Sequence, residues 1–104
     1  MEYKNMSISS SNTADTITLK ISGRFDFSTH KEFRIALNTI TSATKHGTVD
    51  LRSTEYLDSS ALGMLLMLRS KMDNDKSRVS IINSPPEVKK ILNMASFDQL
   101  FTLT

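Results

Sequence analysis

Alternation of apolar and polar positions predicts four strands along the chain. They lie around Met6 and Ile8, at residues 16–21, around Val49 and Leu51, and at residues 78–82. The second strand is the clearest, because Ile17, Leu19 and Ile21 would share one face and the polar residues between them the other. A polar turn over residues 9–15 should separate the first two strands, and Gly23 should end the second. We therefore expect the chain to open with an antiparallel pair.

Apolar residues spaced three and four positions apart predict a first helix after Gly23. Its buried stripe consists of Phe33, Ala36, Leu37 and Ile40. Thr29 and Glu32 have the spacing of a capping box, in which each side chain accepts from a free backbone N–H at the helix start. Residues 45–47 should close the helix, since two basic side chains precede a glycine that can adopt the left-handed C-terminal cap.

Two further helices are predicted in the second half of the chain. Residues 58–72 are apolar on nearly all sides, so this helix should be the most buried one. The third helix begins at residues 84–87, where serine and glutamate have capping-box spacing and a proline occupies the first helical position. Its apolar face consists of Val88, Ile91, Leu92 and Ala95. Residues 100–103 should form either a terminal strand or the tail of a short helix.

The expected order of elements is β-β-α-β-α-β-α, with one further strand if the C-terminus is extended. Strands that alternate with helices pair in parallel through right-handed crossovers, and the opening hairpin adds an antiparallel pair. The expected fold class is α/β, a mixed β-sheet packed by about three to four α-helices. We expect one domain over residues 1–104.

Composition and charge exclude several classes of protein. The net charge of +2 is weak, and no basic stripe with interleaved aromatic residues is visible, so direct nucleic-acid binding is not expected. Without cysteine the chain has no disulfides, thiolate zinc sites or cysteine nucleophiles. The N-terminus has no signal-peptide pattern, and the longest apolar run, residues 61–68, is shorter than the roughly 20 residues of a membrane helix. We expect a soluble cytoplasmic protein without membrane insertion.

Candidate chemistry is concentrated where the third strand leads into the second helix. Asp58 or Ser59 should cap this helix, so free backbone N–H groups and the positive end of the helix dipole would surround Ser59 and Ser60. An anion at such a position is stabilised by about 0.3–1 kcal/mol when exposed. A phosphate attached there would be held without unfolding the helix. The alternative, in which all three polar side chains are only caps, is favoured by the spacing alone.

The segment that follows the third strand resembles a known family motif. The run from Asp58 to Gly63 (Asp-Ser-Ser-Ala-Leu-Gly), after a Val-Asp-Leu strand, is similar to the Asp-Ser-Ser-Gly-Leu-Gly type motif of the STAS domain family, specifically its single-domain anti-sigma factor antagonists. The resemblance covers residues 17–101. Residues 23–26 are similar to the family's Gly-x-Leu-Asp loop, and residues 84–89 to the start of its third helix. Ala61 stands where glycine is usual, which should tighten the helix start.

The resemblance implies a switch protein without enzymatic activity, cofactor or small-molecule substrate. In that family a partner kinase phosphorylates the second serine of the motif, which is Ser60 here. The implied docking surface comprises Asp26, Asp58, Ser59, Ser60, Ala61, Leu62 and Gly63. The unphosphorylated form would bind a kinase-type anti-sigma factor, and phosphorylation of Ser60 would release this partner. A PP2C-type phosphatase would reset the switch.

Two other functions stay open. One is a STAS subunit of a membrane transporter complex, bound to its ATPase, in which Ser60 need never be phosphorylated. The other is a small serine-dependent enzyme, which the sequence disfavours because no histidine neighbours the serine pair and no Gly-x-Ser-x-Gly elbow is present. His30 and His46 lie 16 residues apart without a shared carboxylate cluster, so no metal site is expected.

Overall fold

The computed structural model describes residues 7–104, and within them the chain forms seven strands and three α-helices. Along the chain these are β1 (Ile8–Asn12), β2 (Thr16–Ile21), β3 (Gly23–Phe25), α1 (His30–Leu37), β4 (His46–Asp50), β5 (Thr54–Leu57), α2 (Ser59–Lys71), β6 (Val79–Ile82), α3 (Pro86–Met94) and β7 (Thr102–Leu103). Short 3-10 turns lie at Phe27–Thr29, Lys76–Arg78 and Phe97–Gln99. The predicted alternation of strands and helices is confirmed, and two short strands that the pattern did not indicate, β3 and β5, are added.

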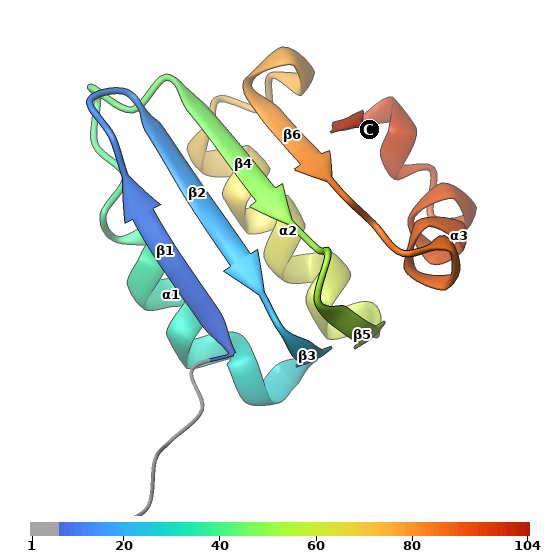
Figure 1. Ribbon diagram of the computed structural model, residues 1–104. Coiled ribbons are helices and arrows are strands. Elements are labelled where there is room, and N and C mark those ends of the chain that lie inside the picture. The colour runs from blue at the N-terminus through green and yellow to red at the C-terminus, as the bar shows by residue number, and fades with distance from the viewer. Residues whose placement is uncertain (1–6) are drawn as a thin grey trace, which may run out of the picture.

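The strands form two sheets (Figure 1). The larger sheet has the order β1-β2-β4-β6-β7, with β1 antiparallel to β2 and all other neighbours parallel. The smaller sheet consists of β3 and β5, also paired in parallel. Of the two alternatives for the C-terminus, the strand is correct, because β7 extends the large sheet beside β6. The expected α/β class with a mixed sheet is confirmed.

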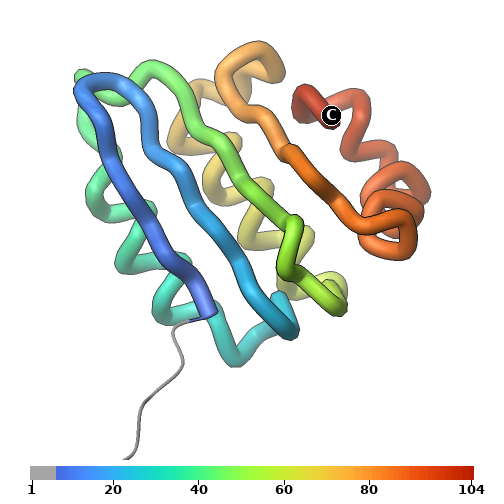
Figure 2. Tube along the Cα trace, viewed as in Figure 1, coloured from blue at the N-terminus to red at the C-terminus, as the bar shows by residue number. Residues whose placement is uncertain are grey.

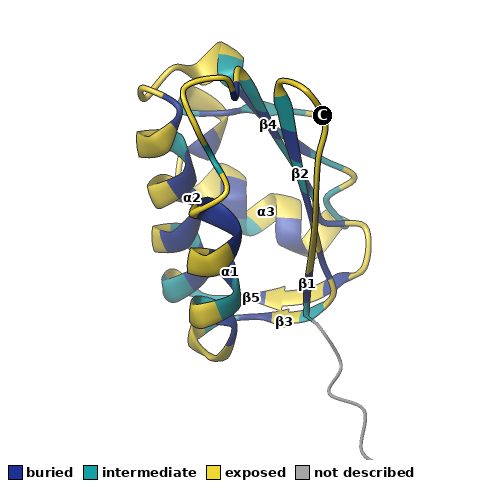
Figure 3. Ribbon diagram, turned by 90° about the vertical axis from the view of Figure 1, so that its left-hand side faces the viewer, coloured by how far each residue is buried: buried dark blue, intermediate teal, exposed yellow. Residues whose placement is uncertain are grey.

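Within residues 7–104, the helices leave one face of the large sheet uncovered. α1 and α2 lie against the other face, and α3 lies at the β6 end of the sheet (Figures 1 and 3). In β2, Ile17, Leu19 and Ile21 are buried toward the helices, whereas Lys20 is exposed on the open side. The hydrophobic core therefore fills the space between the sheet and the helices, as the alternation in β2 predicts.

The first strand is longer than the sequence predicts. Three consecutive serines indicate a turn, but residues 8–12 pair along their whole length with β2. The chain reverses over residues 13–15 (Figure 2), where the N–H of Thr13 donates to the carbonyl oxygen of Thr16 at 2.9 Å. Backbone pairing with a buried neighbour strand overrides the weak preference of serine for turns. Met6, expected in this strand, lies outside the described residues.

Asp26, rather than the predicted capping box at Thr29 and Glu32, organises the start of the first helix. The Asp26 side chain accepts from the N–H of Ser28 at 2.9 Å and caps the 3-10 turn before α1. The Thr29 hydroxyl donates to the Asp26 carbonyl oxygen at 2.7 Å, and Glu32 accepts from the N–H of Ile8 at 3.4 Å. Thr29 is the N-cap residue of α1, but the predicted capping box is wrong because the Thr29 hydroxyl and Glu32 bond elsewhere and no side chain caps this helix start.

The first helix also ends earlier than predicted. α1 ends at Leu37, and the predicted closing segment, residues 45–47, leads into β4 instead. Gly47 is buried within β4 as the partner of Ile17 on β2. A Cβ at this position would lie 3.5 Å from the Leu68 side chain of α2. This is ordinary van der Waals contact, and the predicted C-terminal cap is wrong because Gly47 lies within a strand and not at a helix end.

The third helix begins one residue later than predicted. Its first residue is Pro86, and Pro85 is the N-cap residue with φ −58° and ψ 155°. A proline pushes the residue before it out of the helical region, so Pro85 cannot begin the helix. Ser84 consequently lies outside the helix, no side chain caps the helix start, and the predicted capping box with Glu87 is wrong.

The second helix has nearly the predicted bounds but is not enclosed on all sides. Its buried side carries Ala61, Met64, Leu65 and Leu68. The outward side of α2 is largely exposed (Figure 3). Gly63, Leu66 and Met67 are exposed, so the helix presents apolar residues to the exterior. Within residues 7–104, no helix is both long enough and apolar enough to cross a membrane.

Gly23 on β3 and Gly47 on β4 should differ in their tolerance of alanine. Gly23 has a positive φ of 73°, so Gly23→Ala should lower the free energy of unfolding by about 1–2 kcal/mol through backbone strain alone. Gly47→Ala places a methyl group at normal contact distance from Leu68, and we expect no loss of stability and a gain of up to about 1 kcal/mol, because alanine reduces the conformational freedom of the unfolded chain. Urea denaturation measures both values, and equal effects would contradict this difference between the two backbones.

Candidate functional site

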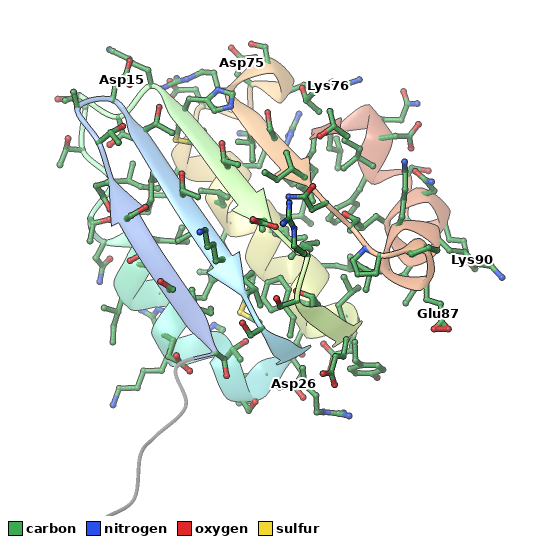
Figure 4. The ribbon with its side chains drawn as sticks, viewed as in Figure 1. Asp15, Asp26, Asp75, Lys76, Glu87 and Lys90 are labelled. Carbon is green, nitrogen blue, oxygen red and sulfur yellow. The ribbon has the colours of Figure 1, made fainter. Side chains whose placement is uncertain are left out.

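The parallel pairing of β3 with β5 brings two aspartates to the same end of the small sheet. Phe25 on β3 and Leu57 on β5 are Cα partners, and an aspartate follows each of them directly. Asp26 (φ −143°, ψ −166°) and Asp58 (φ −126°, ψ −170°) both have an extended backbone, and each caps the helical turn that it precedes. The loop of Asp26 at the end of β3 (Figure 4) therefore lies beside the start of α2.

Asp58 is the N-cap residue of α2. Its Oδ1 accepts from the N–H of Ala61 at 3.1 Å, and the N–H of Leu62 donates to its carbonyl oxygen at 3.1 Å. Ser59 and Ser60 are the first two helical residues, where backbone N–H groups have no acceptor within the helix. Because Asp58 supplies the side-chain cap, the interpretation of both serines as caps is wrong. Ser59 is exposed and Ser60 is half-buried.

Asp26 is held in its ionised form by hydrogen bonds within its own loop. Its Oδ1 accepts from the N–H of Ser28 at 2.9 Å and from the Ser28 hydroxyl at 2.5 Å, while Oδ2 pairs with Nε of Arg24 at 3.2 Å. The bonds from Ser28, followed by those from Arg24, lower the pKa of Asp26 below its ordinary value. The Asp26 side chain is 18% exposed. Because its carboxylate joins Arg24 and Ser28, Asp26 maintains the loop structure in addition to carrying a negative charge.

Arg24 connects the two strands on their outward side. Its Cζ lies 4.5 Å from the centre of the Tyr56 ring, and the two residues are partners across the small sheet. Phe25, between Arg24 and Asp26, is fully buried, so these two neighbours point outward together. Nothing in the sequence pattern singles out Arg24 or Tyr56, because only the pairing of β3 with β5 brings them into contact.

Exposed apolar side chains lie on the elements that carry the two aspartates. Phe27, directly after Asp26, is 71% exposed and stacks on the ring of His30 with centroids 5.4 Å apart. Tyr56 is 42% exposed on β5, and Leu66 and Met67 lie on the outward side of α2. The sequence signal for Phe27 is an aromatic residue in a polar loop, outside the apolar stripe of the helix that follows.

The structure places most of the sequence-predicted docking residues at this end of the small sheet. The exposed or half-buried members are Asp26, Asp58, Ser59, Ser60, Leu62 and Gly63. Leu62 also packs partly against the core. Ala61 is fully buried, so its inclusion among residues that contact a partner is wrong. Its methyl group lies in the core, and only its backbone N–H contributes to the helix start.

The two histidines lie on different elements and have different partners. His30 stacks on Phe27, whereas Nε2 of His46 lies 3.2 Å from the Ser80 hydroxyl on the large sheet. In the described part of the chain, no three His, Cys, Asp or Glu side chains gather closely enough to hold a metal ion.

Comparison with known proteins identifies the family. A family model described as "Mlab, STAS domain" matches residues 8–103. A STAS-domain containing protein of Pseudomonas aeruginosa (strain UCBPP-PA14) is 46% identical over 88 residues, which are 85% of this chain and 87% of that protein. The chain belongs to the STAS domain family, in agreement with its motif from Asp58 to Gly63.

Solved structures share the fold at low sequence identity. The anti-sigma factor antagonist SpoIIAA matches in its unphosphorylated form with a TM-score of 0.72 at 17% identity, covering 93% of this chain and 86% of that chain. The phosphorylated form of SpoIIAA from Bacillus matches with 0.65 at 15% identity, covering 93% and 90%. A sulfate transporter family protein from Wolinella succinogenes matches with 0.67 at 16% identity, covering 81% and 69%. At these identities the likeness shows the fold alone.

Removal of the α2 cap should destabilise the protein measurably. Asp58→Ala should lower the free energy of unfolding by about 1 kcal/mol, because the N–H of Ala61 loses its side-chain acceptor. Asp58→Asn keeps an oxygen acceptor and should lose less than half as much. Urea denaturation measures both variants. An equal loss for both substitutions would show that the charge of Asp58, rather than its capping bond, stabilises the helix.

The pKa of Asp26 should depend on the Ser28 hydroxyl. We expect Ser28→Ala to raise the pKa of Asp26 toward its ordinary value, because one hydrogen bond to the carboxylate is lost. Ser77 makes the same pair of bonds to Asp75, so Ser77→Ala is the matched control and should leave Asp26 unchanged. Carboxyl NMR during a pH titration measures both effects.

The same hydrogen bond predicts how the stability of these variants depends on pH. The folded pKa of Asp26 is lower than its unfolded value, so its contribution to stability is complete above the unfolded pKa and is lost as the pH falls through the folded pKa. At neutral pH the wild-type protein should therefore be more stable than Ser28→Ala. The part of this difference that comes from the ionised Asp26 carboxylate should disappear in acid. A difference that does not change with pH would contradict the role of the Ser28 hydroxyl.

Proposed function

We propose that this chain is a phosphorylation-switched antagonist of an anti-sigma factor. The proposed docking edge consists of the exposed and half-buried residues 26–28, 58–60, 62 and 63. Unphosphorylated, this edge binds a kinase-type anti-sigma factor, and phosphorylation of Ser60 releases it. The observation that carries the proposal is the start of α2, where Asp58 provides the cap and Ser60 lies next to the loop of a second aspartate.

The position of Ser60 supports its assignment as the phosphorylated residue. It is the second residue of α2, in the turn where the N–H groups of Ser59 and Ser60 have no acceptor within the helix. A phosphate on Ser60 can accept from such N–H groups and interacts favourably with the positive end of the helix dipole. The modification then requires no change in the fold. The family motif favours Ser60 over Ser59, because the second serine is the one modified.

Electrostatic repulsion provides the proposed mechanism of release. Phosphorylation adds about 1.5–2 negative charges to an edge that already carries Asp26 and Asp58. A partner surface that fits the unphosphorylated edge would have to accommodate this charge and remove its water, at a cost in binding free energy. Every 1.4 kcal/mol of that cost lowers the affinity about tenfold, so a few kcal/mol suffice for release.

Apolar side chains supply the contact area that the charges cannot. Phe27 projects from the docking edge itself, and Leu66 and Met67 continue the outward side of α2. Aromatic residues and methionine are enriched where proteins bind one another, whereas a catalytic site requires a base or a metal that activates the nucleophile. The site therefore supports binding of a protein partner rather than catalysis.

The proposed cycle needs two partner activities. A kinase-type anti-sigma factor phosphorylates Ser60, and a phosphatase, of the PP2C type in this family, removes the phosphate. Because the kinase consumes ATP, the cycle would take place in the cytoplasm. The alternative function, a STAS subunit of a membrane transporter complex, would use the same edge to bind an ATPase without any phosphate. The identity of the bound partner distinguishes the two.

Variants of Ser60 test the proposal in the cells from which the protein comes. The tagged wild-type protein should copurify with an anti-sigma factor and acquire one phosphate that mass spectrometry maps to Ser60. Ser60→Ala should bind this partner permanently. Ser60→Asp should bind it roughly tenfold more weakly, because one carboxylate reproduces only part of the phosphate charge.

Ser59→Ala is the matched control and should remain switchable. A phosphate mapped to Ser59 or to residues 9–11 would overturn the assignment of Ser60. Equal affinities of the folded wild-type, Ser60→Ala and Ser60→Asp proteins would overturn release by charge. Copurification of a transporter ATPase with an unmodified chain would favour the alternative function.

A further inference from the structure

We propose that Arg24 is the residue that responds to phosphorylation at this site, by moving its ion pair from Asp26 to a phosphate on Ser60. The inference rests on the proposed function, in which Ser60 carries the phosphate. It adds a positioning residue that the family motif does not include, since Arg24 occupies the variable position of the Gly-x-Leu-Asp loop.

The first argument is the placement of four polar or aromatic side chains on one side of the small sheet. Arg24 and Tyr56 are strand partners, and two residues later Asp26 and Asp58 directly follow the ends of β3 and β5 with the backbone still extended. Side chains two positions apart on an extended chain point to the same side. The residues between them point into the core. Arg24 therefore shares the outward side with both aspartates that adjoin the start of α2.

The second argument is that Arg24 is held weakly, through one nitrogen of its guanidinium group. Its Nε pairs with Oδ2 of Asp26 at 3.2 Å, and its guanidinium lies 4.5 Å from the Tyr56 ring centre. The side chain is 66% exposed, and an ion pair in such surroundings contributes little to stability. Arginine has five N–H donors in a planar fork and only Nε pairs with Asp26, so the terminal nitrogens can bind a phosphate when the side chain moves away from Asp26.

The third argument is that Asp26 does not depend on Arg24. The other carboxylate oxygen of Asp26 accepts two bonds from Ser28, which are the leading cause of its lowered pKa. Arg24 can consequently leave Asp26 without disrupting the loop. A phosphate carries more charge than a carboxylate and accepts the guanidinium in a bidentate manner, so it is the stronger partner.

The fourth argument is the charge of the local sequence. Among residues 23–29 and 54–63, Arg24 is the single lysine or arginine, whereas Asp26, Glu55 and Asp58 are acidic. A phosphate on Ser60 is repelled by the two aspartates and attracted by Arg24 and the helix dipole. Transfer of Arg24 would uncover the Tyr56 ring and free one oxygen of Asp26. Phosphorylation would then change the shape of the docking edge as well as its charge.

The test uses the protein with phosphoserine incorporated at position 60 during translation, so that no kinase is required. The ³¹P NMR signal is titrated through the second ionisation of the phosphate in the wild-type background and in Arg24→Gln and Arg24→Lys. Arg34→Gln removes the same charge from an exposed position on α1 and is the matched control. The groups that act on this ionisation are Arg24, the acidic residues Asp26, Glu55 and Asp58, and the N–H groups of the helix start.

We expect Arg24→Gln to raise the second pKa of the phosphate by a few tenths of a pH unit or more, because a cation beside the dianion favours ionisation. Arg24→Lys should restore part of the effect, and Arg34→Gln should resemble the wild-type protein. In the wild-type protein the ¹⁵Nε resonance of Arg24 should also shift when phosphoserine replaces Ser60.

Identical phosphate titrations in the wild-type protein and Arg24→Gln, with an unchanged Arg24 resonance, would overturn the inference. Equal shifts in Arg24→Gln and Arg34→Gln would do so as well, since they would reflect net charge alone. Because the phosphate is incorporated directly, these results do not depend on the natural partner. Failure to find phosphorylated Ser60 in cells would overturn the proposed function and leave the measured Arg24 contact unaffected.

Discussion

The register between β3 and β5 is the constraint on which the candidate site depends. Phe25 and Leu57 are partners in this short parallel pair, and both are buried. The ring of Phe25 stacks on that of Phe33 in α1, with centroids 5.8 Å apart. A slip by one residue would turn these side chains outward and their polar neighbours inward, so packing in the core fixes the register. The same register aligns Asp26 with Asp58 and places two helical turns side by side.

The packing of α2 allows the charge at the exposed start of the helix to change without a change in the fold. The inward side of the helix is anchored by Met64, Leu65 and Leu68, all buried beyond the first turn. Changes at Ser60 therefore act on the exposed start of the helix, while the contacts that stabilise it lie elsewhere. In the proposed switch, the docking edge would gain a phosphate and lose a partner on a scaffold that remains the same. Binding, rather than folding stability, is the quantity that such a switch controls.

Hydrophobic periodicity was sufficient for the elements that enclose the core, whereas local capping signals were not. The strand β2 and the bounds of α2 follow their patterns, because burial of apolar side chains dominates the energetics of both. The two predicted capping boxes failed for different physical reasons. In the first, the Thr29 hydroxyl donates to the carbonyl oxygen of Asp26 instead of accepting from a helix N–H, and the Asp26 carboxylate caps the preceding 3-10 turn by accepting from Ser28. In the second, Pro86 forces Pro85 out of the helical region and moves the helix start.

The sequence by itself determined the α/β class, the STAS family motif and the choice of Ser60 as the candidate modified residue. These conclusions depend on periodicity and on residues adjacent in the chain, which are visible without coordinates. Only the tertiary structure decided that Ala61 is buried and that Arg24 lies between Tyr56 and Asp26. The physical reason is that β3 and β5 are too short to have a recognisable period. Their pairing is specified by core contacts between residues far apart in the chain, and the composition of the docking edge follows from that pairing.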